Sequence, residues 1–234
     1  MNKMILAAVV FVFMVMLSVF MHQQNDMRFV SLTPIVWKEN RPILVDQDSV
    51  NKLLKVVLSD SAYASKSGIN LRNIEHTLNQ NVWVENAQSF MYIDGGVGVH
   101  LTSKLPIVRV QGDSSYYLDG SGQPFPLSTH QSVVVPIFYG NPNDYQRRML
   151  IDAVQKTNQD SFMSNHVVAY EWLSEGLAME PRNQEYQIVL GVPNELKQKF
   201  KKYKAFYAMM QDSTVLKTYK KVNLSFHGQV VCSK

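Results

Sequence analysis

The apolar residues of the chain are concentrated near its beginning. Every residue from Met4 to Met21 is apolar except Ser18. As a helix these 18 residues rise roughly 27 Å, close to the ~30 Å hydrocarbon thickness of a bilayer. The run ends in bulky residues, whereas a signal peptide, the alternative, needs small residues at its cleavage site. The pattern predicts an uncleaved transmembrane helix at 4–21 after a short tail at 1–3.

The charges beside this helix predict its orientation. Lys3 precedes the apolar run, and residues 22–26, which follow it, are uncharged or acidic. Because positive flanks stay in the cytoplasm, the N-terminus is expected there. No second apolar run of this length follows, so we expect a single-pass protein of the inner membrane whose remaining residues are periplasmic.

The next section, residues 27–106, alternates between strand and helix patterns. Its β-branched segments, helix caps and glycine turns predict the order β-α-α-β-β. Two helices on one face of a three-stranded sheet form a small α+β domain. The predicted elements are a strand in Phe29–Trp37, a helix capped by Asp48, a helix capped by Asn70, and strands at Ala87–Ile93 and Val97–Thr102 joined by a turn at Asp94–Gly96.

Residues 107–234 have mainly strand patterns, and they predict a mostly antiparallel β domain that also carries an amphipathic helix. Glycines in Asp119–Gly122 favour a hairpin turn, and prolines 124, 126 and 136 indicate edge or irregular strands. The predicted elements are strands at Ile107–Val110, Tyr116–Leu118, Pro124–Leu127 and Val133–Ile137, a helix from Asn143 or Asp144 to Gln155, strands within Val167–Leu173 and Tyr186–Leu190, a lysine-rich helix, and a final strand in Lys221–Val231.

Charge is also uneven along the chain. Of the formal net charge of +4, residues from 190 onward contribute +7 and residues 1–189 contribute −3. Five lysines lie in Lys197–Lys204, beside an apolar stripe at helical spacing. This spacing predicts an amphipathic helix with a solvated basic face. We do not expect it to bind nucleic acid, because the helical spacing accounts for the lysines and the predicted location is periplasmic. Anionic lipid headgroups or an acidic protein remain possible partners. The stripe consists of Leu196, Phe200, Tyr203, Tyr207 and Met210.

The sequence contains few patterns typical of enzymes. The six histidines have no spacing typical of a metal site, and no phosphate-binding loop is present. Ser49 and Lys52 match the S-x-x-K pattern of penicillin-binding enzymes, but the other motifs of those enzymes are missing. Glu171 and Glu175 are expected to be solvated carboxylates, and the single cysteine, Cys232, lacks the surroundings of a nucleophile. We therefore expect no enzyme activity, cofactor, metal or small-molecule substrate.

Several motifs in order resemble one bacterial family. They follow the predicted membrane helix and extend over about residues 27–231, and together they resemble the cell-division protein family FtsQ (DivIB). The matching segments are Gly68–Glu75 with Val82–Ala87, Leu105–Val110 with its P-x-x-R element, Tyr116–Ser128 with its Y-x-L-D-x-x-G hairpin, Val135–Gly140, and the closing Val222–Val231.

The resemblance implies an architecture and a function. Members of the family have a short cytoplasmic tail, one membrane helix, a POTRA domain, here 27–106, and a β domain, here 107–234. They are non-enzymatic scaffolds of the divisome at the septum, and they bind FtsB and FtsL and thereby influence septal peptidoglycan synthesis. The runner-up interpretation is a POTRA-containing protein of envelope assembly or transport, although such proteins usually carry several POTRA modules or a β-barrel.

The resemblance also suggests a partner-binding site in the last strand. In the family the final strands receive a segment of FtsB, which adds to the sheet edge through backbone hydrogen bonds. Phe226 is the expected anchor. In the alternative interpretation, Leu224 and Phe226 only fill the core and Gly228 only permits a bulge. The expected partner-binding residues are Asn223, Leu224, Ser225, Phe226 and Gly228.

Overall fold

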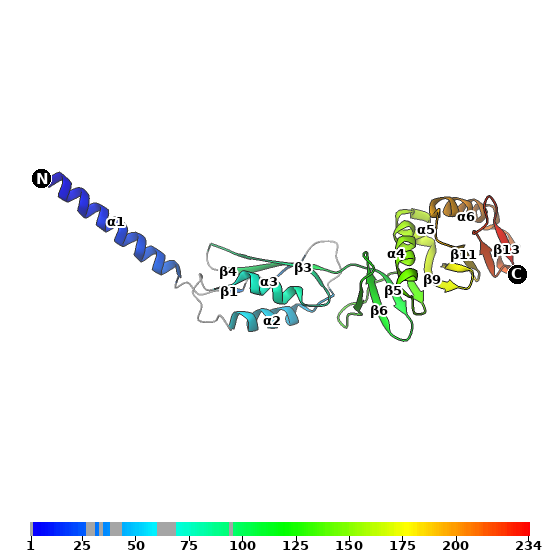
Figure 1. The fold of residues 1–234 in the computed structure, drawn as a ribbon, viewed down its shortest axis with the longest axis horizontal. Helices are drawn as coiled ribbons and strands as arrows, with labels where there is room; N and C mark the ends of the chain where they lie inside the picture. The colour runs from blue at the N-terminus through cyan, green and yellow to red at the C-terminus, as the bar shows by residue number, and fades with distance from the viewer. Residues whose placement is uncertain (1, 27–30, 33–34, 38–43, 60–68, 94–95) are drawn as a thin grey trace. The chain divides into compact units, whose positions relative to one another are not determined.

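A computed structural model describes residues 2–26, 31–32, 35–37, 44–59, 69–93 and 96–234 (Figure 1). The chain divides into two compact units, Met1–Lys104 and Leu105–Lys234. The second unit begins just before the β domain expected from the sequence. The two units are described separately below.

The chain begins with the helix α1, Asn2–Asp26. Its segment Met4–Gln24 is long and apolar enough to cross a membrane, and none of it is buried against the rest of the described chain. A helix that is apolar on all sides and uncovered by protein is typical of a segment surrounded by lipid.

After α1, the described residues of the first unit form a four-stranded sheet and two helices. The strand β4 lies in the middle, antiparallel to β3 and parallel to both β1 and β2. The prediction of three strands missed one, because the segment predicted as one strand in Phe29–Trp37 contains two short ones. Side chains such as Leu54, Ile74 and Val99 form the core between helices and sheet. The elements are β1 Ser31–Leu32, β2 Val36–Trp37, α2 Gln47–Ser59, α3 Leu71–Asn79, β3 Val84–Met91 and β4 Gly96–Ser103.

Side chains cap the two helices of this unit. Asn70 caps α3 as predicted, since its Oδ1 accepts a hydrogen bond from the Asn73 N–H at 3.2 Å. The predicted cap at Asp48 is wrong, because Asp48 lies in the first turn of α2 and Asp46 accepts the Ser49 N–H at 3.3 Å instead. In the predicted Asp94–Gly96 turn, residues 94–95 lie outside the described residues.

The second unit contains a nine-stranded sheet in the order β13-β12-β11-β10-β9-β8-β5-β6-β7. Five of its eight strand pairings are antiparallel, and the predicted α+β class is confirmed. The strands are β5 Pro106–Gln111, β6 Ser115–Asp119, β7 Pro124–Pro126, β8 Ile137–Tyr139, β9 Val167–Leu173, β10 Gly176–Pro181, β11 Gln187–Gly191, β12 Lys221–Asn223 and β13 Val231–Ser233.

Three α-helices contribute to the core of this sheet, together with Leu216 of the 3-10 helix Thr214–Thr218. They are α4 Asp144–Gln159, α5 Ser161–His166 and α6 Leu196–Met210. Asn143 caps α4 and forms a capping box with Gln146, so the first of the two predicted caps is the correct one. Leu150 of α4 and Phe200 of α6 are buried in the core that also holds Val110 of β5.

The structure corrects several predicted strands of this unit. The segment Val133–Ile137 is not one strand, because β8 begins only at Ile137, the last residue of that range. Strand β10 and helix α5 were not predicted at all. The final strand Lys221–Val231 is wrong as a single element, since β12 and β13 are two antiparallel strands separated by a loop over residues 224–230.

Candidate functional site

The five residues expected to bind a partner lie at the junction between β12 and β13. Only Asn223 belongs to a strand, where it pairs with Val189 of β11 on one side and with Val231 of β13 on the other. The other four belong to the loop over residues 224–230, which we call the β12–β13 loop. The predicted set is therefore mainly a loop beside the sheet edge rather than the edge itself.

Leu224 is a core residue in this loop. Its side chain is 0% exposed and lies in the cluster that also contains Val222. Its N–H donates to the Val189 carbonyl at 2.8 Å, which continues the line of β12 for one residue. For the side chain of Leu224 this burial favours the alternative interpretation, in which the residue fills the core and offers no surface to a partner.

The other loop residues are accessible. Phe226 is 46% exposed, although it follows a buried core residue by two positions. Asn223 Oδ1 accepts hydrogen bonds from the N–H and the hydroxyl of Ser225, at 2.9 and 2.6 Å. Gly228 has φ +70°, a left-handed conformation that glycine adopts without strain. The loop thus displays one large apolar side chain on a locally ordered backbone.

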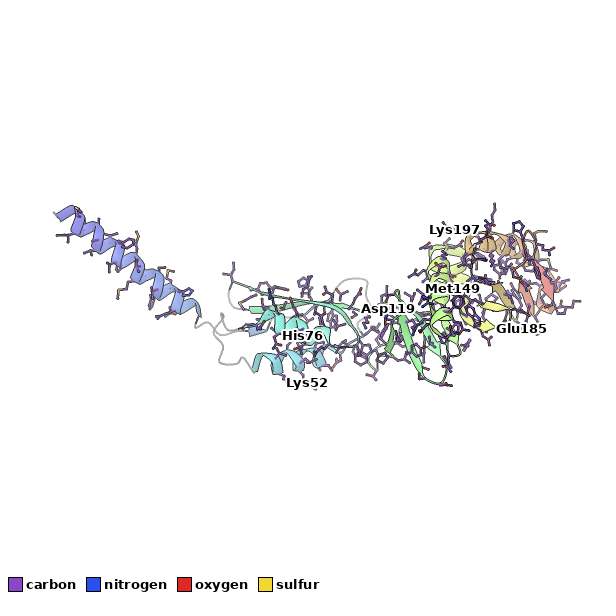
Figure 2. The ribbon with its side chains drawn as sticks, viewed as in Figure 1. Lys52, His76, Asp119, Met149, Glu185 and Lys197 are labelled. Carbon is purple, nitrogen blue, oxygen red and sulfur yellow. The ribbon has the colours of Figure 1, made fainter. Side chains whose placement is uncertain are left out.

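Two lysines of α6 form contacts within the domain that the sequence does not predict. The Nζ atom of Lys202 lies 2.9 Å from the Leu224 carbonyl oxygen and 2.6 Å from that of Phe226. Lys204 forms an ion pair with Asp160 at 2.6 Å. The expected solvated basic face is therefore wrong for these two residues, whereas Lys197 is exposed at the start of α6 (Figure 2).

Lys199 is the most buried of these lysines, with 6% of its surface exposed. Its ammonium group donates to the Leu190 and Val192 carbonyl oxygens at 2.8 and 2.6 Å, and to Asn194 Oδ1 at 2.9 Å. Burial lowers its pKa below the ordinary value for lysine. This ammonium stabilises the connection between β11 and α6, where Glu195 has a left-handed backbone and no side chain caps the helix.

An aromatic cluster lies on the buried side of α6. The hydroxyl oxygen of Tyr203 is 2.6 Å from His166 Nε2 and 2.9 Å from the Tyr186 hydroxyl oxygen. Burial raises the pKa of Tyr186 to about 12, and it raises that of Tyr203 further. Burial also lowers the pKa of His166. Phe162 stacks on the imidazole with ring centroids 4.9 Å apart, so this cluster functions as a satisfied polar core rather than as an open site.

The edge strands in the described residues differ in how well they are protected against pairing with a further strand. Strand β7 ends the nine-stranded sheet at one edge, and it has prolines at both of its ends, which lack an N–H for a further strand. Strand β3 of the first unit is covered by side chains of α3: Asn79 accepts the Ala87 N–H at 2.9 Å, and Glu75 accepts the Ser89 N–H at 2.8 Å. Strand β13 ends the nine-stranded sheet at the other edge. In the described structure it has neither prolines at its ends nor side chains that accept hydrogen bonds from its N–H groups.

The residues singled out for possible catalysis have other contacts. The Ser49 hydroxyl lies 3.4 Å from Asp46 Oδ2, and Lys52 is exposed on α2 (Figure 2). Glu171 accepts a hydrogen bond from Gln187, and Glu175 pairs with Lys221 at 3.1 Å. The Ser49 contact belongs to the cap of α2, the Glu171 contact is a hydrogen bond with a neutral amide, and the Glu175 contact is a surface ion pair.

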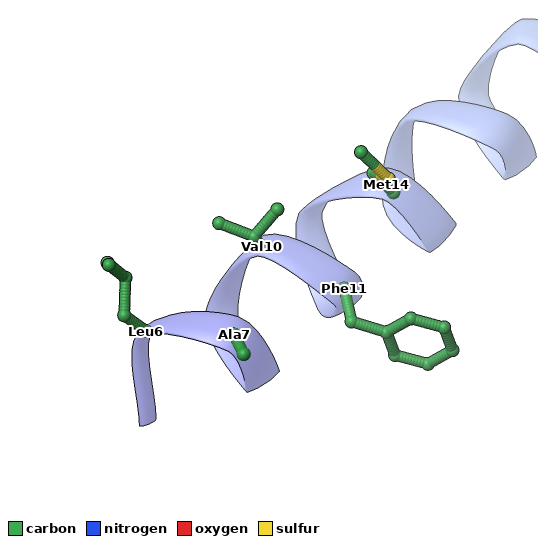
Figure 3. Close-up of a pocket in the computed structure, with 5 residues that line it drawn as sticks. All are labelled: Leu6, Ala7, Val10, Phe11 and Met14. Atoms are coloured by element: carbon green, nitrogen blue, oxygen red, sulfur yellow. The ribbon is translucent and has the colours of Figure 1, made fainter. Parts of the chain in front are cut away.

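Cys232 and two pockets among the described residues are further candidates for chemistry. Cys232 is half-buried in β13, and burial raises the pKa of its thiol, which disfavours the reactive thiolate. Among the described residues no group of three or more His, Cys, Asp and Glu side chains is placed to hold a metal ion. One pocket is an apolar recess on α1 between residues such as Leu6 and Phe11 (Figure 3), and the other is an open polar groove beside Glu75 and Ser89.

The sequence does not predict the hydrogen bonds of Lys199 and Lys202 to carbonyl groups, but the position of both lysines beside the apolar stripe is one indication of them. Each residue directly precedes a member of the stripe, Lys199 before Phe200 and Lys202 before Tyr203, so both flank the buried side of the helix. No local pattern identifies which carbonyl groups they reach, because Leu190 and Leu224 belong to other elements.

Comparison with known proteins identifies the second unit. No curated protein matches the chain. The family described as FtsQ/DivIB, C-terminal related, matches residues 105–233, which is more than half of the chain and nearly all of the second unit. The chain therefore belongs to the FtsQ/DivIB C-terminal related family.

Proposed function

We propose that the chain is a membrane-anchored, non-enzymatic scaffold of the divisome that binds an FtsB-like partner at β13 and the β12–β13 loop. Family membership gives the chain a role in cell division through interactions with other proteins. The single observation that carries the proposed site is the juxtaposition of the outer strand β13 with the exposed side chain of Phe226.

The site fits strand addition by an extended peptide. A strand that ends a sheet offers backbone N–H and C=O groups on its outer side, and these groups provide affinity without regard to sequence. Val231, which is 41% exposed on β13, and Phe226 supply apolar surface for alternate side chains of the added strand. Buried aromatic anchors typically dominate the binding energy of such interfaces.

In the cell, we place the β domain and the expected POTRA domain, residues 27–106, in the periplasm. Helix α1 anchors the chain in the inner membrane with its N-terminus in the cytoplasm, as Lys3 indicates by the positive-inside rule. At the septum the chain then links FtsB- and FtsL-like proteins to the control of peptidoglycan synthesis. A cofactor or a small-molecule substrate has no part in this function.

The test uses the full chain in nanodiscs and the FtsB-like protein of the same organism. Titration calorimetry of the wild type should show one-to-one binding, and Phe226→Ala should weaken it at least about tenfold, as for a truncated anchor residue. Tyr145→Ala provides a matched control, because Tyr145 is 50% exposed on α4 and lies outside the proposed site. Equal binding by wild type and Phe226→Ala would remove the loop from the site.

The cellular arm of the test separates this function from the runner-up. A fluorescent fusion of the full chain should concentrate at midcell, and Phe226→Ala should reduce the recruitment of the FtsB-like protein to that position. A uniform distribution of the fusion around the envelope would contradict the proposed function and favour a protein of envelope assembly or transport.

A further inference from the structure

The β12–β13 loop is bound to α6 by one side chain. The ammonium group of Lys202 donates to the carbonyl oxygens of Leu224 and Phe226, at 2.9 and 2.6 Å. These carbonyls come from the residue that fills the core and from the residue that displays the exposed ring. Hydrogen bonds to a charged donor are stronger than those between neutral groups, so this double contact defines the course of the backbone between the two residues.

The base of this contact is rigid. Leu196, Phe200 and Tyr203 bury one side of α6 in the core of the second unit. Lys199 fastens the beginning of the helix through its three acceptors, and Lys204 pairs with Asp160, which also caps α5. Lys202 therefore projects from a helix that is attached to the domain on both sides of it.

The loop has few other contacts that define the position of Phe226. The Leu224 N–H bonds to Val189, and Asn223 accepts hydrogen bonds from Ser225, but both contacts precede Phe226. Side-chain and loop ordering on association reduces affinity. A lysine that holds the Phe226 backbone before the partner arrives reduces this cost.

We propose that Lys202 is a positioning residue for the partner site, which it serves by holding Phe226 in its binding orientation. This role rests on the function proposed above. It requires no contact between Lys202 and the partner. It also explains why Lys202 contacts the loop, although its helical spacing predicts a solvated side chain. The side chain of Lys201, the preceding residue, is exposed and forms no hydrogen bond or ion pair in the described structure, which makes it the natural control.

The first experiment measures binding of the FtsB-like protein by variants of the full chain in nanodiscs. Lys202→Met keeps the aliphatic stem and removes the donor, and it should weaken binding about tenfold, the effect of losing hydrogen bonds to a charged group. Lys202→Arg, which retains donors, should bind within about threefold of the wild type. Lys201→Met should bind like the wild type. Failure of the wild type to bind contradicts the proposed function itself, whereas equal binding by wild type and Lys202→Met overturns the positioning role.

A double-mutant cycle distinguishes positioning from direct contact with the partner. If Lys202 acts through Phe226, Lys202→Met should cost less than about twofold in the Phe226→Ala background. The same tenfold loss in both backgrounds would overturn the proposal, because the lysine would then act independently of the ring.

Amide hydrogen exchange tests the same idea without a partner. In Lys202→Met the exchange of residues 225–228 should rise at least about fivefold, while that of β11 stays unchanged, since only the loop loses its attachment. A uniform rise across β11 and the loop would indicate a destabilised domain, and Lys202→Gln, which retains an N–H donor, then takes the place of Lys202→Met in both measurements. Unchanged exchange in the loop with either variant contradicts the proposal.

Discussion

Leu224 and Phe226, two residues apart in one loop, are expected to differ sharply in their contributions to stability. Truncation of a buried leucine to alanine costs about 2–5 kcal/mol, and the cost rises with the cavity that is left. Leu224 is 0% exposed, and its backbone is held at both the N–H and the carbonyl, so the site cannot easily collapse. We therefore expect Leu224→Ala to lower the free energy of unfolding by about 3 kcal/mol.

Phe226→Ala is the matched comparison. The ring is 46% exposed, so its truncation should lower the free energy of unfolding by less than about 1 kcal/mol. For a unit of this size the two values correspond to falls in melting temperature of about 10 °C and less than about 4 °C. Thermal unfolding of the full chain in detergent micelles, followed by circular dichroism of the β signal, measures both.

Two results would refute this reasoning. Equal melting temperatures for Leu224→Ala and the wild type would show that the leucine does not support the core. A fall after Phe226→Ala as large as that after Leu224→Ala would show that the ring is a structural element, and its exposure would then be no guide to partner binding. A charged residue at position 224 should unfold the domain, so loss of binding in such a variant carries no information about the interface.

The remaining predictions concern other parts of the second unit. Lys199→Met should lower the free energy of unfolding in urea by about 2 kcal/mol, because the buried carbonyl of Leu190 loses its donor; an unchanged value would mean that the ammonium contributes nothing net. Stability should decrease as the pH falls below 6.5, because burial lowers the pKa of His166 and the unfolded chain therefore takes up the proton first. The urea midpoint should thus fall less between pH 7.5 and 5.5 in His166→Gln than in the wild type, and equal falls would exclude His166 as the cause. Gly176→Ala should cost at least about 2 kcal/mol, since φ is +112° and a Cβ there would lie 2.4 Å from the Gly191 carbonyl group; a melting temperature equal to that of the wild type would contradict this steric argument.

Features that depend on neighbouring residues could be predicted from the sequence. The apolar run of α1, the caps at Asn70 and Asn143 and the stripe of α6 are local patterns, and the structure contains each of them. Helix caps and helical periodicity involve residues within a few positions of one another, so their signals survive without knowledge of the fold. The motifs of the second unit are likewise short local patterns, and the family that they resemble matches residues 105–233.

Other features depended on contacts between distant residues. The segment Lys221–Val231, predicted as one strand, is two strands and a loop, because the chain turns back after Leu224 and β13 pairs antiparallel with β12. The lysines of α6 have helical spacing that predicts a solvated face, yet Lys199 and Lys202 bind carbonyl groups of other elements. A lysine whose helical spacing predicts a solvated side chain becomes a hydrogen-bond donor to the protein only when the fold brings unpaired carbonyl oxygens within its reach. The tertiary structure alone determines which carbonyl groups these are.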